Sequence, residues 1–386
     1  MKKLATGFVA LLAIALAVFF FVIPTWVDRK HNYVYPGSPT ASVQPNGDPR
    51  SRPLAVDMHA DTLLWNRDLN ERATVGHVDI PRLIEGGIAL QGFSVVTKTP
   101  RGLNIDRNPA DSDNITLLAI AQRWPPATWS SLTSRALYQA TRLHDFARGS
   151  NRKLTIIRTR ADLCAYLERR RGDPNITAGW LALEGAHALE GRIENLDVLF
   201  DAGFRVIAPT HFFDSELAGS ASGVAAGGLT ALGTQWVKRM EEKRMIIDLA
   251  HASPRTIDDI LALATRPVIV SHTGVKGTCD NNRNLSDDQI QRIARNGGLI
   301  GVGFWKLATC GEDVASIVRA VRYTGKLAGY DRVALGSDWD GYVPSPIDAS
   351  QIGQLAEALR RSGLTEEELA KVMGGNVIRL FLQLLP

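Results

Sequence analysis

Cysteine and clustered positive charge are both scarce in this chain. Its 386 residues contain three cysteines, Cys164, Cys279 and Cys310, and no C-x-x-C pair. Three cysteines are too few for a disulfide-built scaffold, and without a C-x-x-C pair the sequence indicates neither a cysteine zinc site nor a thiol redox centre. The 44 Lys and Arg residues are nearly balanced by 40 Asp and Glu residues, and no basic block contains interleaved aromatics. We therefore expect no nucleic-acid partner.

Charge is also absent from a long N-terminal stretch. Residues 5–27 hold no charged side chain, and a helix of that length can cross a bilayer. A cleaved signal peptide has a shorter apolar core followed by a small-residue cleavage site, whereas this stretch runs into Phe19–Phe21. We therefore predict an uncleaved signal anchor, that is, a transmembrane helix, over residues 1–27. A cleaved signal and a buried core helix are the alternatives.

The segment after this helix bears on where the rest of the chain lies. Residues 28–53 are rich in Pro, Gly, Ser and Asn and have no apolar periodicity, which predicts a flexible linker. Lys2 and Lys3 precede the apolar stretch and Arg29 and Lys30 follow it, so basic residues do not decide its orientation. We expect a membrane-anchored protein whose catalytic domain is exported to the periplasmic or extracellular side.

From residue 54 onward, short apolar runs alternate with amphipathic segments of helical length. This alternation is typical of βα units around a parallel sheet. The expected strands are residues 55–60, 88–96, 179–186, 204–211, 244–251, 267–273, 298–304 and 332–338. Eight such units predict one (β/α)8 barrel of the TIM type over residues 54–386, an α/β fold. Residues 98–150 form a long insertion, which we interpret as an elaborated loop after the second strand.

The ends of these strands carry an unusual set of side chains. In an α/β barrel the catalytic residues collect at the carboxyl ends of the strands, because the loops of all eight units converge there. Four of the eight histidines lie at or near such ends, namely His59, His211, His251 and His272. Carboxylates lie there too: Asp57, Asp61, Glu184, Asp248, Asp338 and Asp340. Neutral imidazole combined with carboxylate is a donor set that zinc or another borderline divalent ion takes.

Three of these positions are more informative than the rest. Glu184 stands in the apolar run WLALEGA, where burying a carboxylate costs free energy unless a metal cation or an Arg pairs with it. His59 and Asp61 are two apart, so both face the same side of an extended strand. A single strand-end histidine is more often a hydrogen-bonded structural residue, and Asp338 could simply cap its loop. The gathering of the whole set favours a metal site.

Longer motifs add a resemblance to a known family. They are DMHADTLLW near 57, LALEGAHALEG near 181, PTHFFDSELAGSA near 209, IIDLAHAS near 246, PVIVSHTGVKGTCDNNRNLSDD near 267, ALGSDWDG near 334 and GGNVIRLF near 374. Through these segments, which extend over nearly all of residues 54–386, the sequence resembles the membrane dipeptidases, also called renal dipeptidases. They are zinc peptidases built on a (β/α)8 barrel. The N-terminal apolar stretch makes the chain similar to a bacterial-type member with a membrane anchor.

The resemblance implies a role for each matching residue. It implies two Zn²⁺ ions per chain, one bound by His59 and Asp61, one bound by His251 and His272, and both bridged by Glu184. His211 and Arg283 would contact the substrate, with His211 placed at the developing oxyanion. Asp338 would transfer the proton. The chain departs from the family pattern D-G-H-N-D at Met58 and Ala60, and neither position is a ligand.

The resemblance also implies an activity. It implies a zinc-dependent dipeptidase that hydrolyses the peptide bond of dipeptides with a metal-bridging hydroxide and tolerates a D-residue at the C-terminal position. A binuclear zinc amidohydrolase of other amide or lactam bonds, and a catalytically silent membrane-tethered binding protein, are the alternatives. Since the family often dimerises, a homodimer is a further expectation. The neighbourhoods of Cys279 and Cys310 match a paired cysteine site of the family, which implies a disulfide and leaves Cys164 free.

Overall fold

The apolar runs expected as strands form one parallel sheet in the computed structural model, which describes residues 2–36 and 54–386. The strands are β1 (Ala55–Ala60), β2 (Ile88–Val96), β3 (Leu154–Ile156), β4 (Thr177–Glu184), β5 (Phe204–Ile207), β6 (Ile246–Ile247), β7 (Ile269–Thr273), β8 (Leu299–Val302) and β9 (Val333–Leu335). Their order is β6-β5-β4-β2-β1-β9-β8-β7, with β3 added beside β4. A parallel bridge from Asp248 to Ile269 connects the two ends of this order. The prediction of a (β/α)8 barrel is confirmed.

The strands are shorter than expected at their carboxyl ends. The predicted runs continued to His251 and Asp338, but β6 ends at Ile247 and β9 at Leu335. His251 and Asp338 have a left-handed backbone, with φ of 62° and 63°, so neither residue can itself belong to a strand. Hydropathy does not report this change, because the residues stay buried or nearly buried after the strand has ended.

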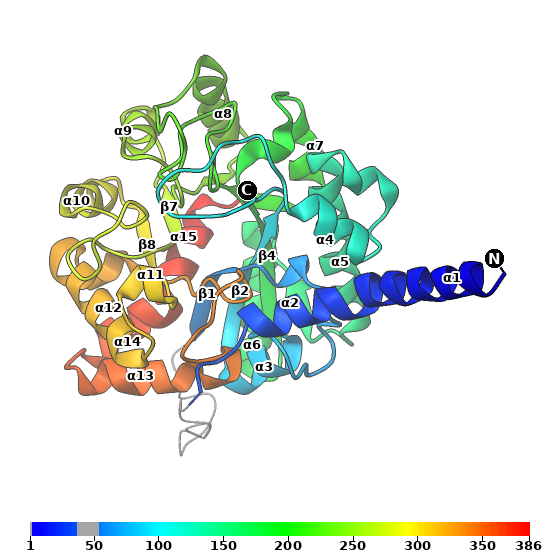
Figure 1. Ribbon diagram of the computed structural model, residues 1–386. Coiled ribbons are helices and arrows are strands. Elements are labelled where there is room, and N and C mark those ends of the chain that lie inside the picture. The colour runs from blue at the N-terminus through cyan, green and yellow to red at the C-terminus, as the bar shows by residue number, and fades with distance from the viewer. Residues whose placement is uncertain (1, 37–53) are drawn as a thin grey trace.

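Helices surround the sheet (Figure 1). They are α3 (Ile80–Gly86), α4 (Ile115–Ala121), α5 (Leu132–Gly149), α6 (Arg160–Gly172), α7 (Asn195–Asp201), α8 (Ala231–Glu242), α9 (Pro254–Leu263), α10 (Asp287–Arg295), α11 (Lys306–Thr309), α12 (Val314–Ala328), α13 (Ile352–Arg361), α14 (Glu366–Ala370) and α15 (Asn376–Leu384). The insertion at 98–150 holds α4 and α5, and β3 and α6 then lead back to β4. Many helices begin with a side-chain cap, as at Ser253, whose Oγ accepts a hydrogen bond from Thr256 N at 3.0 Å.

The last helix closes one end of the barrel. Val377, Leu380 and Phe381 of α15 share a core cluster with residues from the beginnings of the strands, among them Val56 and Trp180. The rings of Trp180 and Phe381 meet edge to face with centroids 4.6 Å apart. Because this packing fills the amino-terminal end of the barrel, the opposite end is the one left for chemistry.

A single long helix precedes the barrel. α1 (Lys2–Ala17), a π-helical turn at Val18–Val22 and α2 (Ile23–His31) run without a break, and α1 projects away from the barrel (Figure 1). The helix over Lys3–His31 is long and apolar enough to cross a membrane, and its most apolar part is not buried against the rest of the protein. By length and hydropathy this helix is a candidate membrane span, and a membrane anchor or a signal sequence has these properties.

The end of this helix lies against the barrel. Residues 28–53 were expected as a flexible linker, yet residues 28–31 form the last turn of α2. Tyr35 N donates to Ser345 O at 3.0 Å, and Ser345 N donates to Tyr33 O at 3.1 Å. Residues 28–36 therefore pack on the folded body, and the remainder of the expected linker, residues 37–53, lies outside the described residues.

Candidate metal centre and active site

The predicted ligands come together at the carboxyl end of the barrel. His59 lies near the end of β1, Asp61 follows it, Glu184 ends β4, and His272 lies on β7. His251 stands in the loop that follows β6. Each of the five residues is at most 5% exposed. Parallel strands of a barrel bring such distant positions to one point, since all their carboxyl ends face the same side.

Glu184 occupies the centre of this group. Its Oε1 lies 2.9 Å from His251 Nε2, 3.2 Å from His272 Nε2 and 3.6 Å from His59 Nε2. Its Oε2 lies 3.4 Å from Nε2 of His211, which stands in the loop after β5. A carboxylate with one oxygen among three imidazoles and the other beside a fourth has the position that a bridging ligand requires.

Asp61 and Asp338 flank the histidine of β1. His59 Nε2 is 3.4 Å from Asp61 Oδ1 and 3.9 Å from Asp338 Oδ1. Three overlapping groups have ligand atoms within 4.8 Å of one another, and they are His59, Glu184 and His272; Glu184, His211 and His251; and His59, Asp61 and Asp338. Glu184 and His59 each belong to two of the three groups, so the three groups form one continuous cluster.

The donor atoms fit a divalent cation. Among the described residues, His59 Nε2, Asp61 Oδ1 and Glu184 Oε2 are buried and have no hydrogen-bond partner. Nε2 of His251 and Nε2 of His272 face each other at 3.0 Å. Burial lowers the pKa of both imidazoles well below the ordinary value, so they are neutral, the form that binds metals. A cation bound among these buried atoms would give each of them a partner.

The carboxylates of the site hold their protons more tightly than usual. Burial, reinforced by the charge of Asp61, raises the pKa of Glu184 to about 7. Burial also raises the pKa of Asp338 well above its ordinary value, with His59 opposing the shift. A raised pKa is what a group that accepts and returns a proton near neutral pH requires.

The other strand-end carboxylates have structural partners. Asp57 accepts hydrogen bonds from Ser337 N at 2.6 Å and Ser337 Oγ at 2.9 Å, which ties β1 to the loop after β9. Asp248 accepts from Ser271 N at 2.8 Å and so fastens β6 to β7. Asp340 lies 2.9 Å from a guanidinium nitrogen of Arg67. None of the three belongs to the groups of candidate metal ligands in the described part of the chain.

Ser271 is a site residue that the sequence did not point to. Its Oγ lies 2.9 Å from His272 Nδ1 and 3.3 Å from His59 Nδ1, the ring atoms turned away from the cluster. A hydrogen bond at the rear nitrogen fixes the tautomer and orientation of a metal-binding histidine. Serine is common at every kind of position, so only its neighbour His272 on the same strand could have drawn attention to it.

Arg283 is the buried cation of the site. It is 8% exposed, and Nη2 donates to His272 O at 2.9 Å. The salt bridges to Asp287 or Asp288 that a surface arginine would make there are not formed among the described residues; Asp287 accepts from Tyr323 and Asp288 lies beside Arg292. Arg283 is one of the residues that line a cavity of about 460 Å³, and none of the five candidate metal ligands lines that cavity. The guanidinium of Arg283 forms no ion pair with another described residue, so it can pair with an anionic group.

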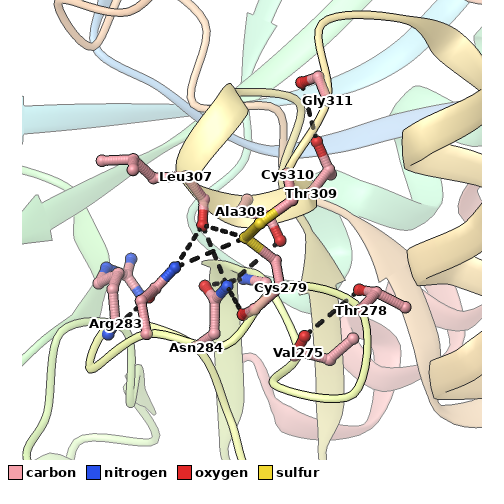
Figure 2. Close-up of a disulfide and its surroundings, with 12 residues drawn as sticks. Val275, Thr278, Cys279, Arg283, Asn284, Leu307, Ala308, Thr309, Cys310 and Gly311 are labelled. Atoms are coloured by element: carbon pink, nitrogen blue, oxygen red, sulfur yellow. Dashed lines mark hydrogen bonds between the residues drawn. A yellow bond between two sulfur atoms is a disulfide. The ribbon is translucent and has the colours of Figure 1, made fainter.

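A disulfide fixes the loop that carries this arginine. Cys279 and Cys310 are bonded, as the family resemblance implied, and Cys164 is free and exposed. Figure 2 shows the bridge beside Asn284, whose Nδ2 donates to Cys279 O at 2.6 Å and to Leu307 O at 3.0 Å. The loop after β7, which carries Arg283, is thereby held against the segment after β8.

Comparisons with known proteins place this geometry in a family. The model of the membrane dipeptidase family (peptidase family M19) matches residues 51–384. The chain is 32% identical to an uncharacterized dipeptidase of Schizosaccharomyces pombe over 52% of this chain and 51% of that relative, so this match spans about half of the relative's length. It is 27% identical to dipeptidase aclJ of Aspergillus oryzae over 84% of this chain and 76% of that relative.

Solved structures share the fold. One is described as dipeptidase AC, a metallopeptidase of the same family, with a TM-score of 0.71, 24% identity and coverage of 86% of this chain and 98% of that chain. Another is a metallopeptidase from Rhodobacter sphaeroides liganded with a phosphinate mimic of the dipeptide L-Ala-D-Ala. It has a TM-score of 0.70, 22% identity and coverage of 86% of this chain and 99% of that chain.

Proposed function

The chain belongs to the membrane dipeptidase family, a family of metallopeptidases that hydrolyse peptide bonds, and we propose that it is a dipeptidase dependent on two Zn²⁺ ions per chain. The observation that carries the proposal is the convergence of two histidine groups on the single carboxylate of Glu184. Imidazole and carboxylate are the usual ligands of catalytic zinc.

Five side chains would hold the metals. His59 and Asp61 would bind one ion, His251 and His272 would bind the other, and Glu184 would bridge them. Two bound zinc ions would polarise the scissile carbonyl and lower the pKa of a shared water, so that hydroxide is available at neutral pH. His59 Nε2 lies 3.4 Å from Asp61 Oδ1 and His251 Nε2 lies 3.0 Å from His272 Nε2, which is compatible with this division. The rings of His59 and His272 also lie with centroids 3.7 Å apart, so the ligands form one continuous cluster.

The remaining polar side chains would handle protons and charge. Asp338 lies 3.9 Å from His59 Nε2 and its raised pKa suits a group that takes a proton from the nucleophile and gives it to the leaving amine. The imidazole of His211 is neutral, because burial lowers its pKa well below the ordinary value, and its N–H would donate to the oxygen that becomes negative during attack. Removing one such donor in comparable sites costs about 3 kcal/mol of the activation barrier.

Arg283 would restrict the substrate to dipeptides. A dipeptide places its free carboxylate one residue beyond the scissile bond, and a guanidinium can bind that group through two parallel hydrogen bonds. A D-residue at the C-terminal position is part of the proposal. The Rhodobacter sphaeroides relative was solved with a mimic of L-Ala-D-Ala, which supports that choice.

The membrane is the other proposed partner. The N-terminal helix would remain uncleaved as an anchor, and the barrel would lie on the exported, periplasmic or extracellular, side. The disulfide between Cys279 and Cys310 supports export, because such bonds persist mainly in oxidising compartments. A homodimer stays a prediction.

Two measurements test the proposed function: the zinc content of the protein and its hydrolysis of a panel of dipeptides. The purified full chain should contain two zinc per chain and should hydrolyse L,L and L,D dipeptides, and a chelator should abolish hydrolysis until zinc is restored. Hydrolysis confined to lactams or other amides would favour the amidohydrolase alternative. If the zinc-loaded protein binds dipeptides but cleaves none, the result would favour the alternative of a catalytically silent, membrane-tethered binding protein.

A further inference from the structure

Buried polar contacts connect the membrane-proximal helix to the loop of Asp338. Asp28 of α2 is 4% exposed, and its carboxylate oxygen lies 3.1 Å from Arg67 Nε. Nη2 of the same guanidinium lies 2.9 Å from Asp340 Oδ2. One buried arginine therefore pairs with a carboxylate of the N-terminal helix and with a carboxylate two residues beyond Asp338. Breaking a buried pair of this kind is costly, because a charge is left without its partner.

Asp340 extends these contacts toward the metal ligands. Thr62, the residue after the ligand Asp61, donates from Oγ1 to Asp340 Oδ2 at 2.8 Å. The backbone N of His77 donates to Asp340 Oδ1 at 2.7 Å. Burial opposes a charge on Asp340, but Arg67 and His77 outweigh burial and hold the pKa of Asp340 well below its usual range. The carboxylate is thus ionised and held from three sides.

A second set of contacts reaches the far end of the same loop. Asn32, which follows α2 and is 1% exposed, receives a hydrogen bond at Oδ1 from Tyr342 N at 2.9 Å. Its Nδ2 donates to Asp28 Oδ1 at 2.8 Å, so the two residues of the N-terminal segment support each other. The rings of His31 and Tyr342 stack with centroids 3.7 Å apart.

The backbone between these contacts adopts an unfavourable conformation. Asp338, Asp340 and Tyr342 have φ of 63°, 64° and 65°. A left-handed backbone is uncommon for residues with a Cβ, and it persists where the surroundings impose it. Here the contacts of the Asp340 carboxylate hold Asp340 in this conformation. The hydrogen bond of Tyr342 N and the stacking of its ring hold Tyr342 in it. Asp338 lies just before these two positions, and its own N donates to His59 O at 3.1 Å, so its orientation depends on β1 and on the contacts of Asp340 and Tyr342 together.

We propose that α2 contributes to catalysis by orienting Asp338. Asp28, Asn32 and Arg67 are the positioning residues. Asp28 and Arg67 act through Asp340, and Asn32 acts through Tyr342. The inference rests on the proposed function, because it takes Asp338 as the group that transfers the proton. It also means that the barrel is fixed to its membrane helix rather than suspended from it on a flexible tether.

The test uses the full chain in detergent micelles with three variants. Asp28→Ala and Asn32→Ala should each lower kcat by roughly 10-fold or more, because small displacements of a reacting group have large effects on rate. KM should stay within about twofold and zinc content should be unchanged, since the ligands and Arg283 are not touched. Arg29→Gln, at the exposed neighbour of Asp28 on the same helix, is the matched control and should retain the parental kcat.

Two further measurements separate positioning from stability. Asp28→Glu restores the carboxylate and should recover part of the lost kcat. If Asp28→Ala unfolds, Asn32→Ala decides alone. Variants that are folded and less heat-resistant but turn over at the parental rate would overturn the inference. If Asp338→Asn is itself fully active, the proposed role of Asp338 has failed; if Asp338→Asn is inactive while Asp28→Ala and Asn32→Ala are normal, only the positioning inference has failed.

Discussion

Oε1 of Glu184 lies 2.9 Å from Nε2 of His251, at the point where β4 and the loop after β6 approach each other. The same oxygen lies within 3.6 Å of His59, which comes from the other side of the site. The two halves of the candidate metal centre therefore depend on one side chain. Loss of that side chain has a different consequence from loss of any single histidine.

Glu184→Ala should abolish binding of both metals. A residue that touches both ions cannot be removed without weakening each, whereas a variant of a terminal ligand should affect mainly one ion. Metal content measured on dialysed protein gives the answer, with Glu194→Ala, an exposed carboxylate outside the site, as the control. Two zinc per chain in Glu184→Ala would refute the bridging role.

Thiol titration of the unfolded protein should give one free thiol without reductant and three with it. Cys279 and Cys310 are bonded in the structure and Cys164 is free. In Cys164→Ser the count without reductant should fall to zero. The bridge closes a loop with a sequence separation of 31 residues, and a loop of that size stabilises the folded state by about 3 to 4 kcal/mol. Three thiols in unreduced protein purified from its membrane would contradict both the bond and export.

Asp338→Asn should keep both metals and bind dipeptides while kcat falls by about 10² to 10⁴. The substitution keeps the shape of the side chain and removes its ability to accept a proton. Zinc content and KM are the measurements that separate this role from metal binding. Zinc lost along with activity would make Asp338 a ligand instead.

Asp340→Asn should destabilise the protein at neutral pH, and the difference from the parent should shrink in acid. The pKa of Asp340 is lowered in the folded state, so its ionised form stabilises the fold above the unfolded-state value of 3.8. That contribution is lost as the pH falls below 3.8 toward the lower folded-state pKa. Denaturant unfolding of parent and variant at pH 7 and near pH 3 measures it. A difference that does not depend on pH would show that the charge of Asp340 is unimportant.

The barrel strands and the candidate metal ligands could be predicted from the order of apolar and polar residues, but some other elements could not. Apolar runs locate strands buried on both faces, and polar residues at their ends locate the site. β3 was not predicted, because the three residues Leu154–Ile156 are too short a run to stand out. The left-handed backbone at His251 was not predicted either, since it is imposed by tertiary contacts rather than by local preference.

The packing of residues 28–36 on the barrel was missed for a related reason. A polar, proline-containing composition predicts solvation of the segment as a whole, and here two polar residues decide the structure. Asp28 and Asn32 are buried because Arg67 and the N–H of Tyr342 are placed to receive them. Only the folded barrel brings those partners to the helix, so the segment considered alone gives no sign of them.

Arg283 should discriminate between a free dipeptide and its amide. Its guanidinium is buried beside His272 O and forms no ion pair within the described chain, so a substrate carboxylate can pair with it directly. Arg283→Lys keeps the charge and loses the planar pair of donors, and it should lower kcat/KM for dipeptides by about 10-fold or more. Arg283→Ala should lower it further. A dipeptide amide should be a poor substrate of the parent and should lose little more in either variant. Arg292 lines the same cavity but already pairs with Asp258. The control variant Arg292→Lys should therefore leave hydrolysis of both substrates unchanged. Equal losses for acid and amide in the Arg283 variants would mean that this residue does not recognise the carboxylate.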